Sequence, residues 1–350
     1  MAKGIISKPY QIKAWSELVG LNPLLKAHDT LPQGKFARLN LDFSQVHQVD
    51  AIGLSIFLAR VVQARSMVSD ATITIDMPTS RAVASTLESL GLKMHLARLG
   101  LELSLEQRLF DQIDDVPASA QKCLLDEQLF HWETVVSIRP GQGDRDQLIS
   151  YAKREIKNFL NRDEARRFVH EQVMIILLEM VKNTFDHSGR PALLGLSFIE
   201  SSARKGKFAF SYCDTGEGIS RTVRHHIKTL ATQSGRTESL DAIENELSSE
   251  KTKHLIRLSQ NGAFSDILHW ALQPGHSTKS GNGVNFGLGL MYIVEGSRKC
   301  GIRLSLKEAD SMWILTQLSS PYSHAEIRRF GINTCSPSLL MFFGELEYSR

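Results

Sequence analysis

Three polar residues of chemically useful types lie in one apolar segment, residues 171–189, which has no Gly or Pro before its last position. Glu179, Asn183 and His187 are spaced at i, i+4 and i+8, so they fall on nearly one face of a helix. The expected buried surface of this helix consists of Met174, Ile175, Leu177, Leu178 and Val181. A carboxylate, an amide and an imidazole in register are unusual for a plain core helix. Taken alone, the segment is still better explained as an amphipathic core helix with a polar edge.

A second segment follows two apolar runs, residues 193–200 and 207–214, which are predicted to form a β-hairpin. The second run ends in Asp214, and glycines follow at Gly216 and Gly218. Such glycines let the backbone turn tightly and approach a flat ligand closely, while the aspartate can accept a hydrogen bond from an exocyclic amine. An ordinary loop turn explains this short pattern equally well.

The third segment, residues 275–301, is a glycine-rich stretch that leads into an apolar helix. Free backbone N–H groups and the helix dipole favour a phosphate at such a helix start. The stretch lacks the pattern of a P-loop. A flexible loop before a helix is the alternative interpretation.

Together and in this order, the three segments resemble the three nucleotide-binding sequence boxes of the GHKL ATPase superfamily, which includes gyrase, MutL and the histidine kinases. The resemblance covers residues 146–320, and the first box is similar to that of the anti-sigma-factor serine kinases. It implies an α+β fold, a two-layer α/β sandwich of the Bergerat type, that binds ATP with Mg²⁺.

The resemblance also implies roles for individual residues. Asn183 would hold Mg²⁺ through its side-chain oxygen, and Glu179 would act as the general base. Asp214 would read the adenine amine, with Gly216 and Gly218 letting the base approach. The phosphates would be cradled by Gly287, Leu288 and Gly289, with Thr278 and Lys279 as lid contacts. His187 is left open between a site residue and a structural imidazole.

The segment between the second and third boxes is long, and residues 220–272 are predicted to form a helical insertion. It is either a nucleotide-sensitive lid or partner surface, or an insertion without a role at the site. Residues 302–309 and 311–318 predict a closing hairpin. Residues 101–145 are interpreted as a linker or helical connector, and residues 321–350 as a C-terminal tail.

The N-terminal part, residues 1–100, is expected to form a small α/β domain. Strands are predicted at residues 37–43 and 71–76, each followed by a helix, the first capped by Asp50 and the second ended by Gly91. Residues 36–100 resemble the STAS domain of anti-sigma-factor antagonists. Regulatory STAS domains commonly carry a phosphorylated Ser or Thr after this aspartate, but here the position is Ala51. The module is therefore expected to be a docking surface, within the chain or toward a partner, and a generic α/β domain is the alternative.

Bulk properties narrow the class of protein. The 350 residues suffice for two domains, and a formal net charge of +3 is too small to argue for nucleic acid or an anionic membrane as partner. The four cysteines are scattered, which fits reduced thiols in a cytoplasmic protein. No signal peptide or membrane-spanning run is predicted.

Three functions follow as hypotheses. The leading one is a cytoplasmic regulatory ATPase or serine/threonine protein kinase with the STAS-like module as docking surface. The second is an ATP-sensing interaction protein that switches partners without turnover. The third is a dimeric clamp ATPase, which would require a homodimer.

Overall fold

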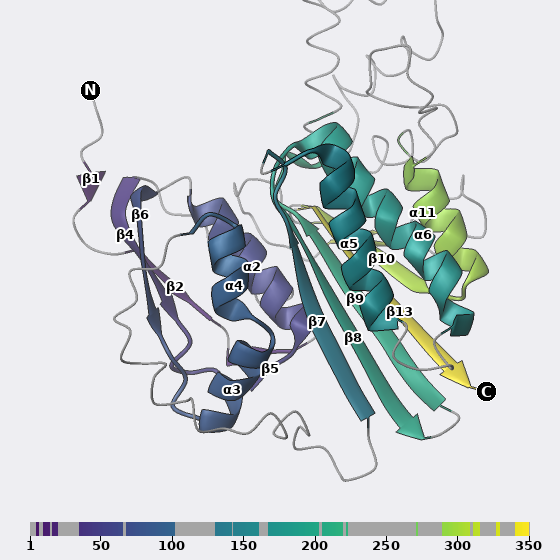
Figure 1. Cartoon of the computed structure of the whole chain (residues 1–350), viewed down its shortest axis with the longest axis horizontal. Helices are drawn as coiled ribbons and strands as arrows, with labels where there is room; N and C mark the ends of the chain where they lie inside the picture. The colour runs from purple at the N-terminus through teal and green to yellow at the C-terminus, as the bar shows by residue number, and fades with distance from the viewer. Residues whose placement is uncertain are drawn as a thin grey trace, which may run out of the picture.

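The described part of the computed structural model contains two large β-sheets, each covered by helices, and a short two-stranded one, and the mixed α+β architecture expected from the sequence is confirmed (Figure 1). The structure describes residues 5–6, 10–14, 16–19, 35–65, 68–101, 130–141, 143–160, 167–202, 205–219, 222, 271, 289–308, 311–315, 327–329 and 340–349.

The N-terminal sheet is parallel and is built around one strand, β4 (Lys35–Asp42). Its partners are β1 (Ile5–Ile6), β2 (Tyr10–Lys13) and β6 (Val68–Asp76), and a separate short parallel pair joins β3 (Glu17–Leu18) to β5 (Gln48–Val49). The helices of this part are α2 (Ala51–Arg65), α3 (Arg81–Ser89) and α4 (Leu92–Arg98). The strand–helix–strand–helix order predicted from the sequence is confirmed.

Both predicted helix boundaries in this part are confirmed. Asp50 caps α2, because its Oδ1 accepts the backbone N–H of Gly53 at 2.6 Å. Gly91 ends α3 with a φ of +75°, a conformation that a glycine adopts without steric cost.

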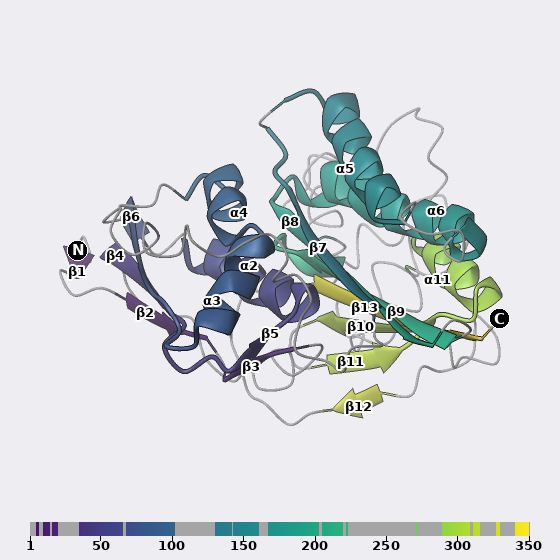
Figure 2. The ribbon, with the colours of Figure 1, turned by 60° about the horizontal axis from the view of Figure 1, so that its bottom comes forward.

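The second sheet has seven strands, and every neighbouring pair is antiparallel. In spatial order the strands are β12 (Ile327–Arg329), β11 (Ser311–Ile314), β10 (Arg303–Glu308), β13 (Leu340–Ser349), β9 (Lys205–Asp214), β8 (Ala192–Ser202) and β7 (Phe130–Ile138). One face is covered by α5 (Arg145–Leu160), α6 (Arg167–Asn183) and α11 (Gly289–Lys299), as Figures 1 and 2 show. The two predicted hairpins, β8–β9 and β10–β11, are confirmed.

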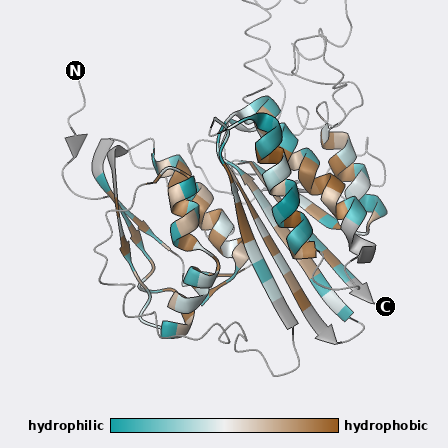
Figure 3. Cartoon of the chain, viewed as in Figure 1, coloured by the Kyte–Doolittle hydropathy of each residue, from teal (hydrophilic) through white to brown (hydrophobic). Residues whose placement is uncertain are grey.

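Hydrophobic side chains hold this helical layer on the sheet. Buried residues of α5, α6 and α11 form one core with residues of β7–β10 and β13. Figure 3 shows the hydrophobic colour gathered on α6 and α11 and on the strands beside them. The end of α6 and the start of α11 are thereby held against the end of β9.

Two interpretations of the chain outside the central segment were wrong. Residues 130–138 are not part of a helical connector but the edge strand β7, and residues 340–349 are not a tail but strand β13, which lies between β9 and β10. Both strands are covered on two faces, so their sequences lack the polar–apolar alternation of a half-exposed strand. The start of β13, Leu340 to Phe343, is a continuous apolar run.

Helix α2 covers the face of the seven-stranded sheet that α5, α6 and α11 leave open, and it packs on β7, β8 and β9. Buried residues of the parallel sheet and α2 form one core with Leu193, Cys213 and Phe343 of the second sheet. The contact is close, since Ser55 Oγ lies 2.6 Å from Ser211 Oγ. The N-terminal module is therefore packed onto the second sheet.

Within the described part of the chain, no helix combines the length and the apolar character needed to cross a membrane.

The approach of α2 to β8 leads to a stability prediction. A Cβ added at Gly195 would lie 2.5 Å from the carbonyl oxygen of Ala51 and 2.8 Å from Ser55 Oγ. We expect Gly195→Ala to lower the free energy of unfolding by about 1–3 kcal/mol, because backbone must move to make room. Urea denaturation measures this. Gly143→Ala, where a Cβ meets only ordinary contacts at 3.7 Å and beyond, is the matched control, and equal effects of the two substitutions would refute the close packing.

A buried histidine at the joint between the two sheets leads to a pH prediction. His95 of α4 lies 3.1 Å from Ser137 Oγ of β7, and burial, with the positive charge of Arg98, lowers the pKa of His95 to about 4. Between that value and the ordinary pKa of 6.5, the unfolded chain binds the proton and the folded chain does not, so stability falls as pH falls. We expect this residue to account for a loss of about 2 kcal/mol between pH 7 and pH 5.

Urea unfolding of His95→Gln at the two pH values tests this, because glutamine does not titrate there. The exposed His47, replaced as His47→Gln, is the control. An acid-induced loss of stability that is the same in wild type and His95→Gln would contradict the assignment.

Candidate functional site

Helix α6 packs against the seven-stranded sheet, α5 and α11, and these contacts explain which of its residues are buried. Its side toward the sheet, α5 and α11 buries Val173, Met174, Ile176, Leu177, Met180 and Val181. Ile175, which was expected in the core, is 57% exposed, and Leu178 is only partly buried. Glu179 and Asn183 are half-buried at the edge of this packed side. The polar edge predicted from the spacing is thus present, one helical turn separating its carboxylate from its amide.

The helix changes form directly after Asn183. Residues Thr184–Ser188 form a π-helical turn, η4, in which the N–H of Gly189 donates to the carbonyl of Thr184, five residues back, at 2.8 Å. The wider turn interrupts the α-helical register, and the side chain of His187 is exposed. The role of His187 stays a prediction. Thr184, the first residue of this turn, is completely buried.

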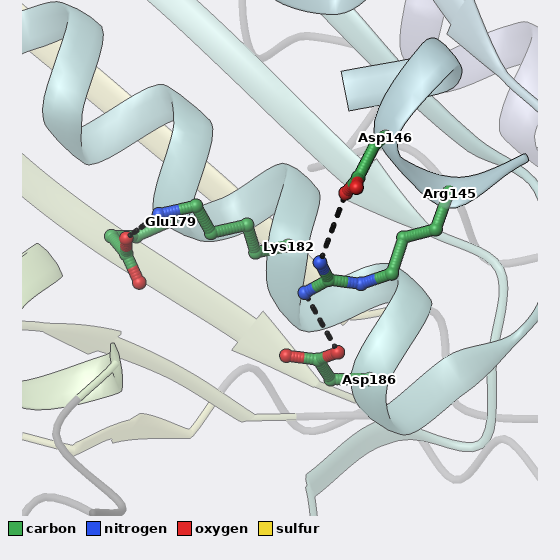
Figure 4. Close-up of polar contacts among 5 residues, drawn as sticks. All are labelled: Arg145, Asp146, Glu179, Lys182 and Asp186. Atoms are coloured by element: carbon green, nitrogen blue, oxygen red, sulfur yellow. Dashed lines mark hydrogen bonds and ion pairs between the residues drawn. The ribbon is translucent and has the colours of Figure 1, made fainter. Parts of the chain in front are cut away.

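Two ion pairs involve residues at the end of α6, and Arg145 of the second also pairs with its neighbour Asp146 (Figure 4). Lys182 Nζ is 2.5 Å from Glu179 Oε1, with the side chains 42% and 22% exposed. Arg145 at the start of α5 reaches Asp186 of η4, with 3.1 Å between Arg145 Nη2 and Asp186 Oδ1. Because the first pair is solvent-accessible, it is worth little energy and can be exchanged for another partner. The second pair ties η4 to α5.

Asp214 ends β9 as a buried carboxylate, 7% exposed. Its Oδ2 accepts the hydroxyl of Thr184 at 2.8 Å, and its Oδ1 accepts the N–H of Gly216 at 2.8 Å. Burial raises the pKa of Asp214 above its ordinary value, while hydrogen bonds from Ser188, Gly216 and Thr184 act in the opposite direction. The first and second sequence segments therefore meet at this carboxylate.

Glycine is required where these two segments touch. A Cβ at Gly216 would lie 2.3 Å from Ser188 Oγ of η4. Gly218 has a φ of +77°, in the left-handed region. The two glycines predicted to let a ligand approach thus also let the loop after β9 turn against η4.

The third segment meets the first at the start of α11. A Cβ at Gly289 would lie 2.9 Å from Asn183 Oδ1, so the first residue of α11 faces the predicted metal ligand directly. The two helices run antiparallel, as Cys300 Sγ donates to Gln172 Oε1 at 2.9 Å at the other end of the pair. The other expected residues of this segment, Thr278, Lys279, Gly287 and Leu288, lie outside the described residues. So does the insertion 220–272, apart from residues 222 and 271.

A second buried acid, which the sequence analysis missed, lies at the same sheet edge. Glu308 ends β10, is 2% exposed, and accepts the N–H of Ile219 through Oε2 at 3.0 Å. Leu340 of β13 pairs with Asp214, and β13 also pairs with β10, so Glu308 and Asp214 are two strands, or about 10 Å, apart. The loop from Asp214 to Ile219 is thereby held by a carboxylate at each end. No sequence signal marked Glu308, since a charged residue at a strand end is ordinary.

No family model, curated protein or solved structure matches the chain. Among the described residues, no group of three or more His, Cys, Asp or Glu side chains is arranged to hold a metal ion. The contacts among the three segments are therefore the features that bear on function.

The role of Glu308 is directly testable by amide hydrogen exchange at Ile219. We expect Glu308→Ala to accelerate this exchange about tenfold, because a part-buried N–H loses an acceptor worth roughly 1–3 kcal/mol. Glu308→Gln keeps an acceptor oxygen and should have a smaller effect. Glu347→Ala, an exposed position on β13, serves as the control. If Glu308→Ala left the exchange rate of Ile219 unchanged, the carboxylate would not hold the loop.

Proposed function

We propose that this chain is an ATP-binding regulatory protein of the GHKL type that hydrolyses ATP or phosphorylates a Ser or Thr hydroxyl of a protein partner. One observation carries the proposal. The end of α6, the end of β9 and the start of α11 are distant in sequence, yet Thr184 is bonded to Asp214 and Asn183 lies against Gly289. These are the three segments in which the sequence resembles the superfamily's nucleotide-binding boxes.

The base of the nucleotide would be read at Asp214. An ionised carboxylate offers about four lone-pair sites, and three hydrogen bonds already reach this one, from Thr184, Ser188 and Gly216. One acceptor site remains for the exocyclic amine of adenine. The glycine turn after Asp214 permits the close approach of a flat ring.

The phosphates would lie at the start of α11. The first N–H groups of this eleven-residue helix have no partner within the helix, and its dipole favours an anion there. Asn183 Oδ1 beside it is a hard oxygen ligand of the kind Mg²⁺ takes when the nucleotide phosphates and water supply its other ligands. This donor set fits a Mg²⁺ ion that arrives with ATP, and the bound ion would neutralise phosphate charge. The lid contacts, Thr278 and Lys279, stay predictions. So do the phosphate-cradling residues Gly287 and Leu288.

Glu179 is the proposed general base. It lies one helical turn before Asn183, so its carboxylate would take the proton of the attacking water or hydroxyl on the phosphate side of the site. Lys182 occupies this carboxylate. Bound phosphates would offer Lys182 a stronger anionic partner, and its departure would free Glu179.

The same ion pair favours the second candidate, an ATP-sensing protein without turnover. If Lys182 keeps Glu179 occupied when nucleotide is bound, no base is available, and ATP acts only by rearranging the protein. Measurement of phosphate release, and of label transfer to a partner protein, separates the two candidates.

The packing of the STAS-like module favours its role as a docking surface within the chain. Ala51 takes the place of the phosphorylated residue, and both it and the nearby Ser55 are buried against the seven-stranded sheet. A hydroxyl in this interface is out of reach of a kinase. We propose that the module is a fixed cover of the ATP-binding sheet rather than a phosphorylation switch.

The metal role of Asn183 gives the main test. We expect Asn183→Ala to weaken Mg²⁺-dependent ATP binding about tenfold or more, through loss of a ligand oxygen, while thermal stability stays near that of wild type because the side chain is half-buried. Isothermal titration with ATP, with Mg²⁺ and with EDTA, measures this. Gln172→Ala, which removes an exposed amide from the same helix, is the matched control.

Unchanged affinity in Asn183→Ala would remove Asn183 from the metal role. Absence of ATP binding by the wild-type protein would overturn the proposed function. If the protein hydrolyses ATP, Glu179→Gln is expected to bind ATP but to release no phosphate. Glu171→Gln, at an exposed position of the same helix, is expected to keep both ATP binding and phosphate release.

A further inference from the structure

Thr184 is the residue through which the end of α6 holds Asp214. It is the first residue of η4, follows the predicted metal ligand directly, and is completely buried. Its hydroxyl donates to Asp214 Oδ2 at 2.8 Å and also forms a hydrogen bond with the hydroxyl of Tyr212. A threonine hydroxyl has one proton to give. Since Asp214 receives it, Tyr212 must donate to Thr184.

Tyr212 can act as the donor that this arrangement of hydrogen bonds requires. Burial, together with the negative charge of Asp214, raises the pKa of Tyr212 well above its ordinary value. The phenol therefore keeps its proton at neutral pH and acts as a donor. The Tyr212 hydroxyl thus donates a hydrogen bond to Thr184, and the Thr184 hydroxyl donates one to the carboxylate of Asp214.

The carboxylate needs these donors because it is buried. Removing a charged group from water favours its neutral form, and each hydrogen bond to the ionised form opposes this. A protonated carboxyl has one fewer acceptor position and carries a donor instead. Acceptance of a hydrogen bond from an amine by Asp214 consequently depends on the groups that keep its carboxylate ionised and correctly oriented.

We propose that Thr184 is a positioning residue that holds Asp214 as an ionised acceptor for the exocyclic amine of adenine, and that Tyr212 orients Thr184 for this task. The inference rests on the proposed function and deepens it, because it names what sets selectivity for a purine with a 6-amino group. A 6-oxo purine presents an acceptor at that position, and two acceptors repel.

The test compares binding of Mg-ATP and Mg-ITP, whose bases differ in the 6-amino and 6-oxo groups, by isothermal titration. Thr184→Val is nearly isosteric and removes the donor. We expect it to lower ATP affinity about tenfold and to reduce the ATP/ITP preference by a similar factor. Thr184→Ser restores the hydroxyl and should recover most of both. Tyr212→Phe keeps the Thr184 donor but loses its orientation, so an effect of about threefold is expected.

The pH dependence of ATP affinity provides a second measurement, which a purely structural role of Thr184 would leave unchanged. With one donor fewer, the pKa of Asp214 rises, so the loss of ATP affinity on acidification should begin at higher pH in Thr184→Val than in wild type. Thr86→Val removes a hydroxyl that is bonded to its own helix in α3, at 3.0 Å from Ala82 O, and should change neither the preference nor the profile.

The double substitution Tyr212→Phe/Thr184→Val removes the orphaned phenol and still lacks the donor, so it carries the test if Thr184→Val alone does not fold. An ATP/ITP preference and pH profile equal to wild type in the folded variants would overturn the inference while leaving ATP binding intact. Absence of ATP binding by the wild-type protein would instead overturn the proposed function.

Discussion

A carboxylate removed from water must be surrounded by donors, and at Asp214 these donors connect the parts of the site. One comes from the buried hydroxyl of Thr184 at the end of α6, and one from Gly216 in the loop that follows β9. Thr184 is the first residue of the π-helical turn that follows Asn183. The preceding residue, Asn183, faces the start of α11 at Gly289. The contact between Thr184 and Asp214 therefore joins the proposed metal-binding and base-reading ends of the site.

The seven-stranded sheet can carry this site because both of its faces are covered. On one face α5, α6 and α11 bring the polar groups to the end of β9, and on the other α2 of the N-terminal module fills the gap. Alternate residues of β9 consequently serve two layers, since Ser211 contacts Ser55 of α2 and Tyr212 contacts Thr184. A shift of α2 would therefore displace β9, the strand that ends in Asp214. This arrangement gives the N-terminal module a physical link to the proposed nucleotide site.

Much of the local structure could be predicted from the sequence, because it depends on local patterns. The cap at Asp50, the end of α3 at Gly91 and the two hairpins follow from near-neighbour rules. Strands β7 and β13 could not be recognised, since burial on both faces removes alternation and their partners are remote. The π-turn at residues 184–188 has no sequence signal in an otherwise helical segment. Glu308 was missed for a related reason, because its importance comes from β13 lying between β10 and β9.

The central claim is that the ends of α6 and β9 and the start of α11 together bind Mg-ATP. Hydrogen–deuterium exchange of the full chain, with and without saturating Mg-ATP, tests it most directly. The account predicts protection in residues 183–188, 214–219 and 289–294 at the same nucleotide concentration, with no change in β4 or β6 of the parallel sheet. Unchanged exchange in these three segments at saturating Mg-ATP would contradict it.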